Sequence, residues 1–260
     1  ARLNSGDVVG TVASTIGTTT ITVILNESVL DNTLSAVTFK IKPPKFNYIY
    51  AAHDRLWGFG EGAIAPDNLG SAANRARVFY TEYVNDPQGW YDTEGVLQSI
   101  NLADKMPNQD TLQAMAIKDG LTVFFSKTQT QVWVGTNPTV LGDFAWQKTL
   151  PVGVVHGDLV VDLPNDIGFF TAHGARTLSR LLQTEQLDVG DVGQEISPTL
   201  TTDVATALSH VDVYRQIQSF AYNPQDWFGF YIAGKARVFQ FTPSGIGWST
   251  FTGLFSTATT

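Results

Sequence analysis

One pattern recurs along this sequence: a short apolar segment, a turn that carries an aspartate, and a second segment rich in aromatic residues. It is found at Tyr48–Gly60, Leu159–Gly174 and Ser219–Phe241, and again around the turn Lys118-Asp119-Gly120. The aspartates of the four turns are Asp54, Asp119, Asp166 and Asp226. They recur at intervals of about 45 to 65 residues, close to the period of about 40–50 residues of propeller blades. The pattern therefore predicts an all-β fold, a β-propeller of about five blades.

The turn at Asp119-Gly120 is the clearest local signal. Two residues of this type between apolar segments are typical of a tight β-hairpin, in which the glycine takes a positive φ. We therefore expect Gly120 to lie in the left-handed region.

The composition is consistent with one folded domain over residues 1–260, or with a fragment of a longer protein. Aromatic residues make up 12% of the 260 residues, and 23 are glycine. No apolar run approaches the length of a membrane-spanning helix, so we expect no membrane span. The chain has no cysteine, which excludes disulfides and thiolate metal sites and fits assembly in a reducing cytoplasm, although an extracellular particle remains open.

The charge argues against a protein that grips nucleic acid. The formal net charge is −8, and the 16 basic residues are scattered along the chain. Tight phosphate binding needs clustered Lys and Arg. An acidic surface instead lets DNA slide past, because like charges repel.

Three regions depart from the repeated pattern. The first 45 residues, Thr- and Val-rich, predict about three strands, the last ended by Pro43-Pro44. Residues 184–198 are acidic and low in aromatic residues, and they predict a projecting loop, or a solvated surface loop. Its acidic residues are Glu185, Asp188, Asp191 and Glu195.

Only Thr201–Ile217 has apolar residues at helical spacing, and its alternative is a strand with Ala-rich flanks. Thr202 or Asp203 is the expected N-cap. The apolar positions are Val204, Ala207, Leu208, Val211 and Tyr214.

No motif predicts catalysis. The histidines, His53, His156, His173 and His210, are far apart in the sequence and lack metal-ligand spacing. The four turn aspartates are the only candidates for a pair of glycosidase carboxylates. Aspartate is also favoured in tight turns because its side chain bonds to nearby backbone amides. We therefore expect structural aspartates, no catalytic, cofactor or metal site, and no enzyme.

The aromatic residues allow two interpretations. Tyr80, Tyr83, Trp90 and Tyr91 would form a platform for a sugar if they were exposed and flat. Aromatic residues at alternate strand positions more often pack in a core. Packing is the interpretation that we favour, and the same holds for four tryptophans in strand patterns, Trp133, Trp146, Trp227 and Trp248.

The order of these segments resembles the tail-nozzle, tail-tube or packaged-DNA stabilisation proteins of short-tailed bacteriophages. The shared pattern is an Arg-bearing aromatic strand at Arg77–Tyr83, an Asp-Pro turn followed by Trp90, and then a hydrophobic strand, a Gly turn and the segment VFFSKTQTQVWVG. The resemblance covers about residues 46–250. It implies a β-propeller subunit in a homohexameric ring below the portal, located in the virion tail and assembled in the host cytoplasm.

The resemblance also implies the partners: other copies of this chain, portal and tail proteins, and duplex DNA that passes transiently through the channel. A glycan-binding or glycan-cleaving propeller is the alternative that the residues leave open.

Overall fold

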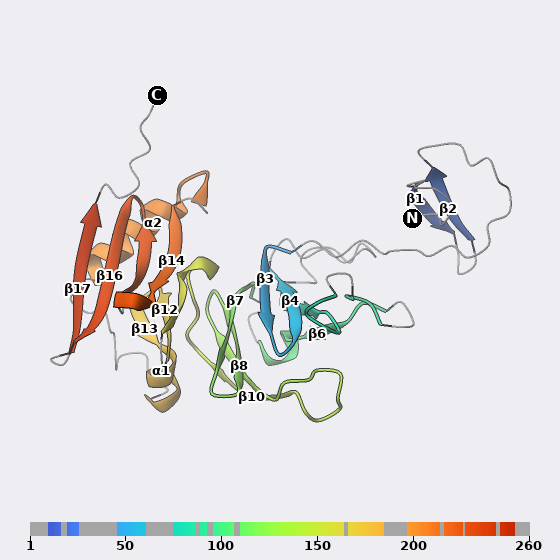
Figure 1. The fold of residues 1–260 in the computed structure, drawn as a ribbon, viewed down its shortest axis with the longest axis horizontal. Helices are drawn as coiled ribbons and strands as arrows, with labels where there is room; N and C mark the ends of the chain where they lie inside the picture. Colours follow the sequence, from blue (N-terminus) through green and yellow to red (C-terminus); the bar gives the residue numbers. More distant parts are fainter. Residues whose placement is uncertain are drawn as a thin grey trace.

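The computed structural model describes residues 10–16, 20–25, 46–60, 75–86, 89–92, 96–106, 110–163, 166–184, 197–213, 216–225, 227–242 and 245–252. Most of them belong to four antiparallel sheets that follow one another along the chain and lie in a row (Figure 1). The first contains β3 (Tyr48–Ala52), β4 (Arg55–Phe59), β5 (Arg77–Tyr80) and β6 (Ser99–Asn101). The second contains β7 (Leu112–Lys118), β8 (Leu121–Ser126), β9 (Thr130–Val134) and β10 (Ala145–Leu150). The third contains β11 (Val160–Leu163), β12 (Asp166–Thr171) and β13 (Gly174–Thr177). The fourth contains β14 (Ile217–Tyr222), β15 (Trp227–Ile232), β16 (Lys235–Thr242) and β17 (Gly245–Thr252).

Each sheet is an up-and-down meander, with strands hydrogen-bonded in chain order. The repeated sequence pattern corresponds to the first hairpin of each sheet, so the hairpins were predicted correctly. Asp119 (φ 50°) and Gly120 (φ 77°) form the expected two-residue turn between β7 and β8. Positive φ at both positions matches the right-handed twist of the strands. His53-Asp54 and Ala233-Gly234 form turns of the same kind.

The sheets pack face to face through aromatic side chains of their second strands. Trp57 of β4 contacts Phe124 of β8, with ring centroids 6.1 Å apart. The next residue on β8, Phe125, points to the opposite face and meets Phe169 of β12 at 5.0 Å. Phe170 then meets Phe230 of β15 at 6.3 Å. Adjacent residues of one central strand thus bind a sheet to both of its neighbours.

The first strands of the sheets gather on a shared side of the stack. β3 contacts β7, and β11 contacts β14. The 3-10 helix η3 (Gly157–Leu159), which precedes β11, contacts both β7 and β14. Two further 3-10 helices, η2 (Ala103–Lys105) and η5 (Asn223–Gln225), lie in connections.

Two helices connect the third and fourth sheets, α1 (Leu178–Thr184) and α2 (Ser197–Leu208). Leu178, Leu200 and Val204 of these helices are buried in the core shared with both sheets. A helix was predicted here, but its position was wrong: it begins at Ser197, and β14 already starts at Ile217. Proline is tolerated in the first helical turn, so Pro198 allows the earlier start.

The predicted cap of this helix and part of its apolar face were also wrong. Thr202 and Asp203 lie inside α2, and the Thr202 hydroxyl donates to the Pro198 carbonyl oxygen. Val211 lies beyond the helix and is fully exposed. Tyr214 is outside the described residues.

The fold is mostly β, as predicted, but the four described sheets do not close into a propeller. In the first 45 residues, the described strands are β1 (Gly10–Ile16) and β2 (Thr20–Leu25), which pair with each other. The acidic residues of the predicted loop at 184–198 lie outside the described residues. Within the described part of the chain, neither helix is long and apolar enough to span a membrane.

Candidate functional site

A hollow of about 450 Å³ lies on the side of the stack where the first strands meet. Its walls come from the first sheet, the second sheet, the segment before η3 and the end of α2. The lining residues are Asn47, Tyr48, Gln113, Lys127, Val155, His156 and Leu208. A smaller hollow of about 220 Å³ adjoins it, shares Tyr48 and Gln113, and is also lined by Tyr50, Asp158 and Asp162.

Close backbone packing at Gly157 shapes this site. A Cβ atom at this position would lie 2.1 Å from the Gln113 carbonyl oxygen and 2.6 Å from the Tyr48 ring. Only glycine therefore lets η3 press against β7 and β3. The tight approach fixes His156 and Asp158, on either side of Gly157, at the edges of the two hollows.

His156 is buried and is held as a neutral imidazole. Its Nδ1 accepts a hydrogen bond from the backbone N–H of Asp158 at 3.2 Å, and its ring meets the edge of Tyr48. Burial lowers the pKa of His156, although the Asp158 carboxylate, 3.6 Å away, pulls it upward and Lys127 lowers it further. Burial likewise raises the pKa of Asp158, against the attraction of His156.

The smaller hollow contains a second perturbed group. Burial, and then the nearby Asp162 carboxylate, raise the pKa of Tyr50, so its hydroxyl remains a proton donor. Together with Tyr48, Gln113 and His156, the two hollows present hydroxyl, amide and imidazole groups beside aromatic rings. This set, together with the charged side chains of Lys127, Asp158 and Asp162 in the walls, suits the binding of a polar ligand by hydrogen bonds and ring stacking.

The three described turn aspartates, Asp54, Asp119 and Asp166, lie in the first hairpins of three different sheets. Asp54 and Asp119 are exposed, in the first turns of the first and second sheets. The Asp119 carboxylate lies 2.9 Å from Lys118 Nζ. Asp166 begins β12, and its carboxylate accepts the backbone N–H groups of Ile167 and Ser179, at the start of α1. Asp226 lies outside the described residues. The described aspartates thus serve turns and a helix start.

The histidines do not form a cluster. His53 Nε2 and the Thr122 hydroxyl form a hydrogen bond of 2.9 Å. Burial lowers the pKa of His53, although the carboxylates of Asp54 and Asp143 act to raise it. His173 and His210 are exposed, in a turn and after α2. Across the described residues, no group of three His, Cys, Asp or Glu side chains is placed to hold a metal ion.

The four aromatic residues considered as a sugar platform are divided between two surfaces. Tyr80 packs between the first and second sheets, whereas Trp90 packs against Phe79 on the opposite face of the first sheet. Tyr83 is exposed and Tyr91 is half-buried. Of the four strand tryptophans, Trp133 is buried, Trp227 and Trp248 are half-buried, and Trp146 is exposed beneath the Lys105 ammonium.

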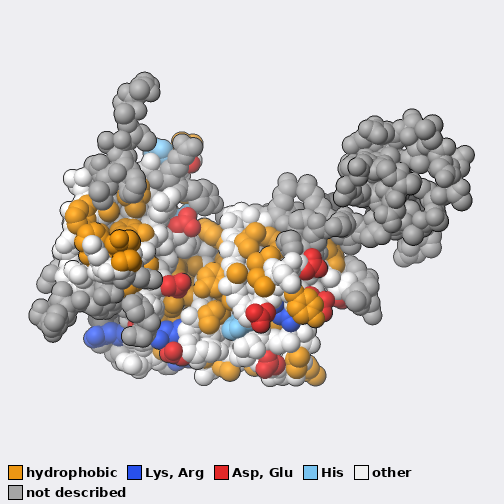
Figure 2. Space-filling view, in the orientation of Figure 1, with side chains coloured by type: hydrophobic (Ala, Val, Ile, Leu, Met, Phe, Trp, Pro, Cys, Tyr) orange, Lys and Arg blue, Asp and Glu red, His pale blue; other side chains and the backbone are white. Residues whose placement is uncertain are grey.

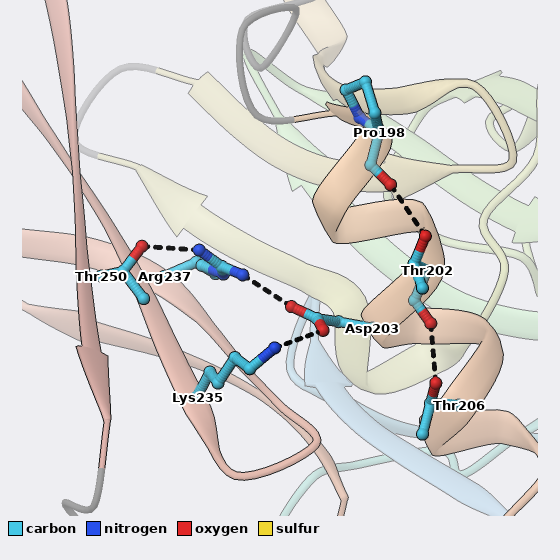
Figure 3. Close-up of polar contacts among 7 residues, drawn as sticks. All are labelled: Pro198, Thr202, Asp203, Thr206, Lys235, Arg237 and Thr250. Atoms are coloured by element: carbon cyan, nitrogen blue, oxygen red, sulfur yellow. Dashed lines mark hydrogen bonds and ion pairs between the residues drawn. The ribbon is translucent and has the colours of Figure 1, made fainter.

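Asp203 was expected to cap a helix, but it joins α2 to the fourth sheet (Figure 3). Its carboxylate accepts hydrogen bonds from Lys235 Nζ and Arg237 Nη2, each at 2.7 Å. Burial alone would raise the pKa of Asp203, but the hydrogen bonds and charges of Lys235 and Arg237 outweigh it and lower the pKa. Arg237 also donates to the Thr250 hydroxyl of β17.

Comparison with known proteins finds no matching family model and no similar curated protein.

Proposed function

We propose that this chain is a structural, non-enzymatic component of the tail of a short-tailed bacteriophage, in the nozzle or tail-tube ring below the portal. It would form part of a channel through which DNA passes and is retained. The support comes from the sequence resemblance and from one structural observation, the face-to-face stack of meander sheets with their first strands on a shared side. Successive blades of a propeller also stack face to face, with their first strands toward a central channel, so this observation supports the proposal.

The finer fold is part of the proposal. The four sheets would be consecutive blades of a propeller of about five blades, with α1 and α2 following the three strands of the third sheet. The remaining blade would come from a further sheet.

The mass of the purified protein in solution, followed by electron microscopy of the assembled fraction, tests this proposal. We expect a homo-oligomeric ring with a central opening. Free protein should bind duplex DNA no more tightly than about 10⁻⁴ M at physiological salt, because the net charge of −8 opposes phosphate contacts. A strictly monomeric protein, or micromolar DNA binding, would contradict it.

A glycan-binding protein is the second candidate, and the hollow lined by Tyr48, Gln113 and His156 is the observation in its favour. Its test is binding of polysaccharide fragments by calorimetry, with Tyr48→Ala as the variant and Tyr83→Ala, an exposed tyrosine outside the hollow, as the control. Binding lost only in Tyr48→Ala would favour this function over the tail component.

A further inference from the structure

The outer face of the fourth sheet carries a group of aromatic side chains. Strand pairing places Tyr222 opposite Trp227, and Tyr231 and Phe251 on either side of Ala236. These residues lie on the face opposite Phe228 and Phe230, which are buried in the core. We call the side that carries Tyr222, Trp227, Tyr231 and Phe251 the terminal face.

The terminal face is partly open to solvent, since Trp227 and Tyr231 are half-buried and Ala236 between Tyr231 and Phe251 is buried. Tyr222 is 49% exposed and Phe251 is 37% exposed. Trp227 lies between them, with ring centroids 6.3 Å from Tyr222 and 6.0 Å from Phe251. Figure 2 shows hydrophobic side chains gathered over this sheet. A contiguous exposed apolar surface of this kind marks an interaction site.

The terminal face is also free of charge among the described residues. The charged side chains of β16, Lys235 and Arg237, lie on the other side of the sheet, bonded to Asp203 (Figure 3). Gln218, Gln240 and Ser249 are the polar residues on the terminal face, by the strand register. A second molecule of the same acidic chain would therefore meet no like charge on this face.

The chain itself shows what covers such a face. Between the second and third sheets, and between the third and fourth, an aromatic face is covered by the aromatic face of the next sheet. The terminal face continues this series. A sugar ligand fits less well, because the rings of Tyr222 and Phe251 are tilted by 55° and 32° from Trp227 and present no common plane.

The matching surface is the outer side of the first sheet. Ile49 is 62% exposed there, on the face that also carries Phe79. Val96, in the connection that follows Trp90, is 57% exposed. Phe46 and Trp90 already cover Phe79 on this side, so Ile49 and Val96 are exposed apolar side chains that a partner would meet there.

We propose that the terminal face binds the first sheet of a second copy of this chain, so that the stack continues head to tail between copies. A heterologous contact of this kind closes into a ring when the rotation permits. The inference rests on the proposed ring and identifies the surface that would build it.

Cysteine pairing tests the contact directly, because the chain has no cysteine of its own. Ile49→Cys and Phe251→Cys are made in separate samples, mixed and oxidised. We expect disulfide-linked dimers in the mixture. Leu141→Cys, a fully exposed position in the second sheet's β9–β10 connection, is the matched partner for Phe251→Cys and should not cross-link. Dimers of Phe251→Cys alone would show that the face pairs with itself and would overturn the head-to-tail contact.

Charge insertion distinguishes this inference from the proposed function. Phe251→Glu should weaken assembly by at least about tenfold, with an unchanged circular dichroism spectrum, whereas Leu141→Glu should not. Tyr222→Gln, a milder change, should act in the same direction if Phe251→Glu impairs folding. A ring that persists in both variants would overturn the inference and leave the tail function standing. A wild-type monomer would overturn both, and sugar binding by that monomer lost in Tyr222→Gln would assign the face to a glycan.

Discussion

Both ends of the stack carry aromatic side chains on an outer sheet face, but these side chains are buried at one end and exposed at the other. On the outer face of the first sheet, Phe79 and Trp90 are almost fully buried, and Phe46 covers Trp90 with ring centroids 4.6 Å apart. On the outer face of the fourth sheet, Tyr222 and Phe251 remain exposed. The difference lies in the connections. The long β5–β6 connection folds back over its own sheet, whereas the connection between β15 and β16 is the two-residue turn Ala233-Gly234, which is too short to form such a cover.

The comparison teaches that strand alternation alone does not decide whether an aromatic face becomes core or interface. The first sheet has Phe79 on its outer side, and the fourth sheet has Trp227, Tyr231 and Phe251 there, at alternate strand positions. A face becomes core only where some other segment of the chain reaches it. The first end is covered by its own chain, whereas the last end keeps aromatic side chains exposed.

The largest expected effect tests this asymmetry with two matched tryptophans. Trp90→Ala should cost about 3–5 kcal/mol of unfolding free energy, because it empties a closed packing site. Trp227→Ala should cost under about 2 kcal/mol in the dissociated chain, because its site is open on one side. Urea unfolding at low protein concentration measures both. Equal costs would remove the distinction between the two ends.

The next effect concerns what holds the fourth sheet to the rest of the stack. Asp203→Asn should cost about 3 kcal/mol, because it leaves Arg237 buried without its carboxylate partner. Asp119→Asn is the control: the same substitution in the exposed pair with Lys118 should change stability by less than about 1 kcal/mol.

The same carboxylate predicts an acid response. The folded-state pKa of Asp203 is lowered from an ordinary value of 3.8, so its contribution is present above that pH and is lost as the pH falls through the folded pKa. Below about pH 4, wild-type stability should therefore approach that of Asp203→Asn. A constant difference between the two proteins down to the lowest pH at which they fold would contradict this role.

Much of the fold is predictable from sequence because its signals are local. The hairpin at Asp119-Gly120 is encoded within a few residues, and so is the aromatic strand that follows it. The start of α2 was misplaced because Asp203 carries a typical capping side chain, and its partners Lys235 and Arg237 lie far along the chain. Whether the sheets close into a propeller depends on contacts between blades, which no local pattern encodes.

The hollow was missed for the same reason. Tyr48, Gln113 and His156 come from three parts of the chain, and no motif connects them. The one available signal was Gly157 between His156 and Asp158, a glycine in a position where two polar side chains flank a close backbone approach.

A smaller effect compares turns in the second and fourth sheets. Gly120→Val should cost about 1–3 kcal/mol, because valine is strained at φ 77°. Ala233, at φ 49° in the corresponding kind of turn, already carries such strain, so Ala233→Gly should stabilise the chain by up to about 1 kcal/mol. Thermal melts of both variants measure the two shifts. Shifts of the same sign would contradict this account of the turns.

The smallest expected effect is a pH dependence of folding stability that arises in the middle of the stack, at His156, and not at its ends. Because burial lowers the pKa of His156 from an ordinary value of 6.5, the unfolded chain takes up the proton more readily than the folded chain. The stability that neutral His156 contributes should therefore be complete above pH 6.5 and decline as the pH falls toward the pKa of His156 in the folded chain. His156→Gln should flatten the slope between about pH 7 and pH 5, whereas His173→Gln, at an exposed turn, should keep it. Burial raises the pKa of Asp158, so protonation of this carboxyl group increases stability as the pH falls and opposes the effect of His156. The stabilities of the two variants are therefore compared at each pH. An identical slope in both variants would mean that His156 is not the group that titrates.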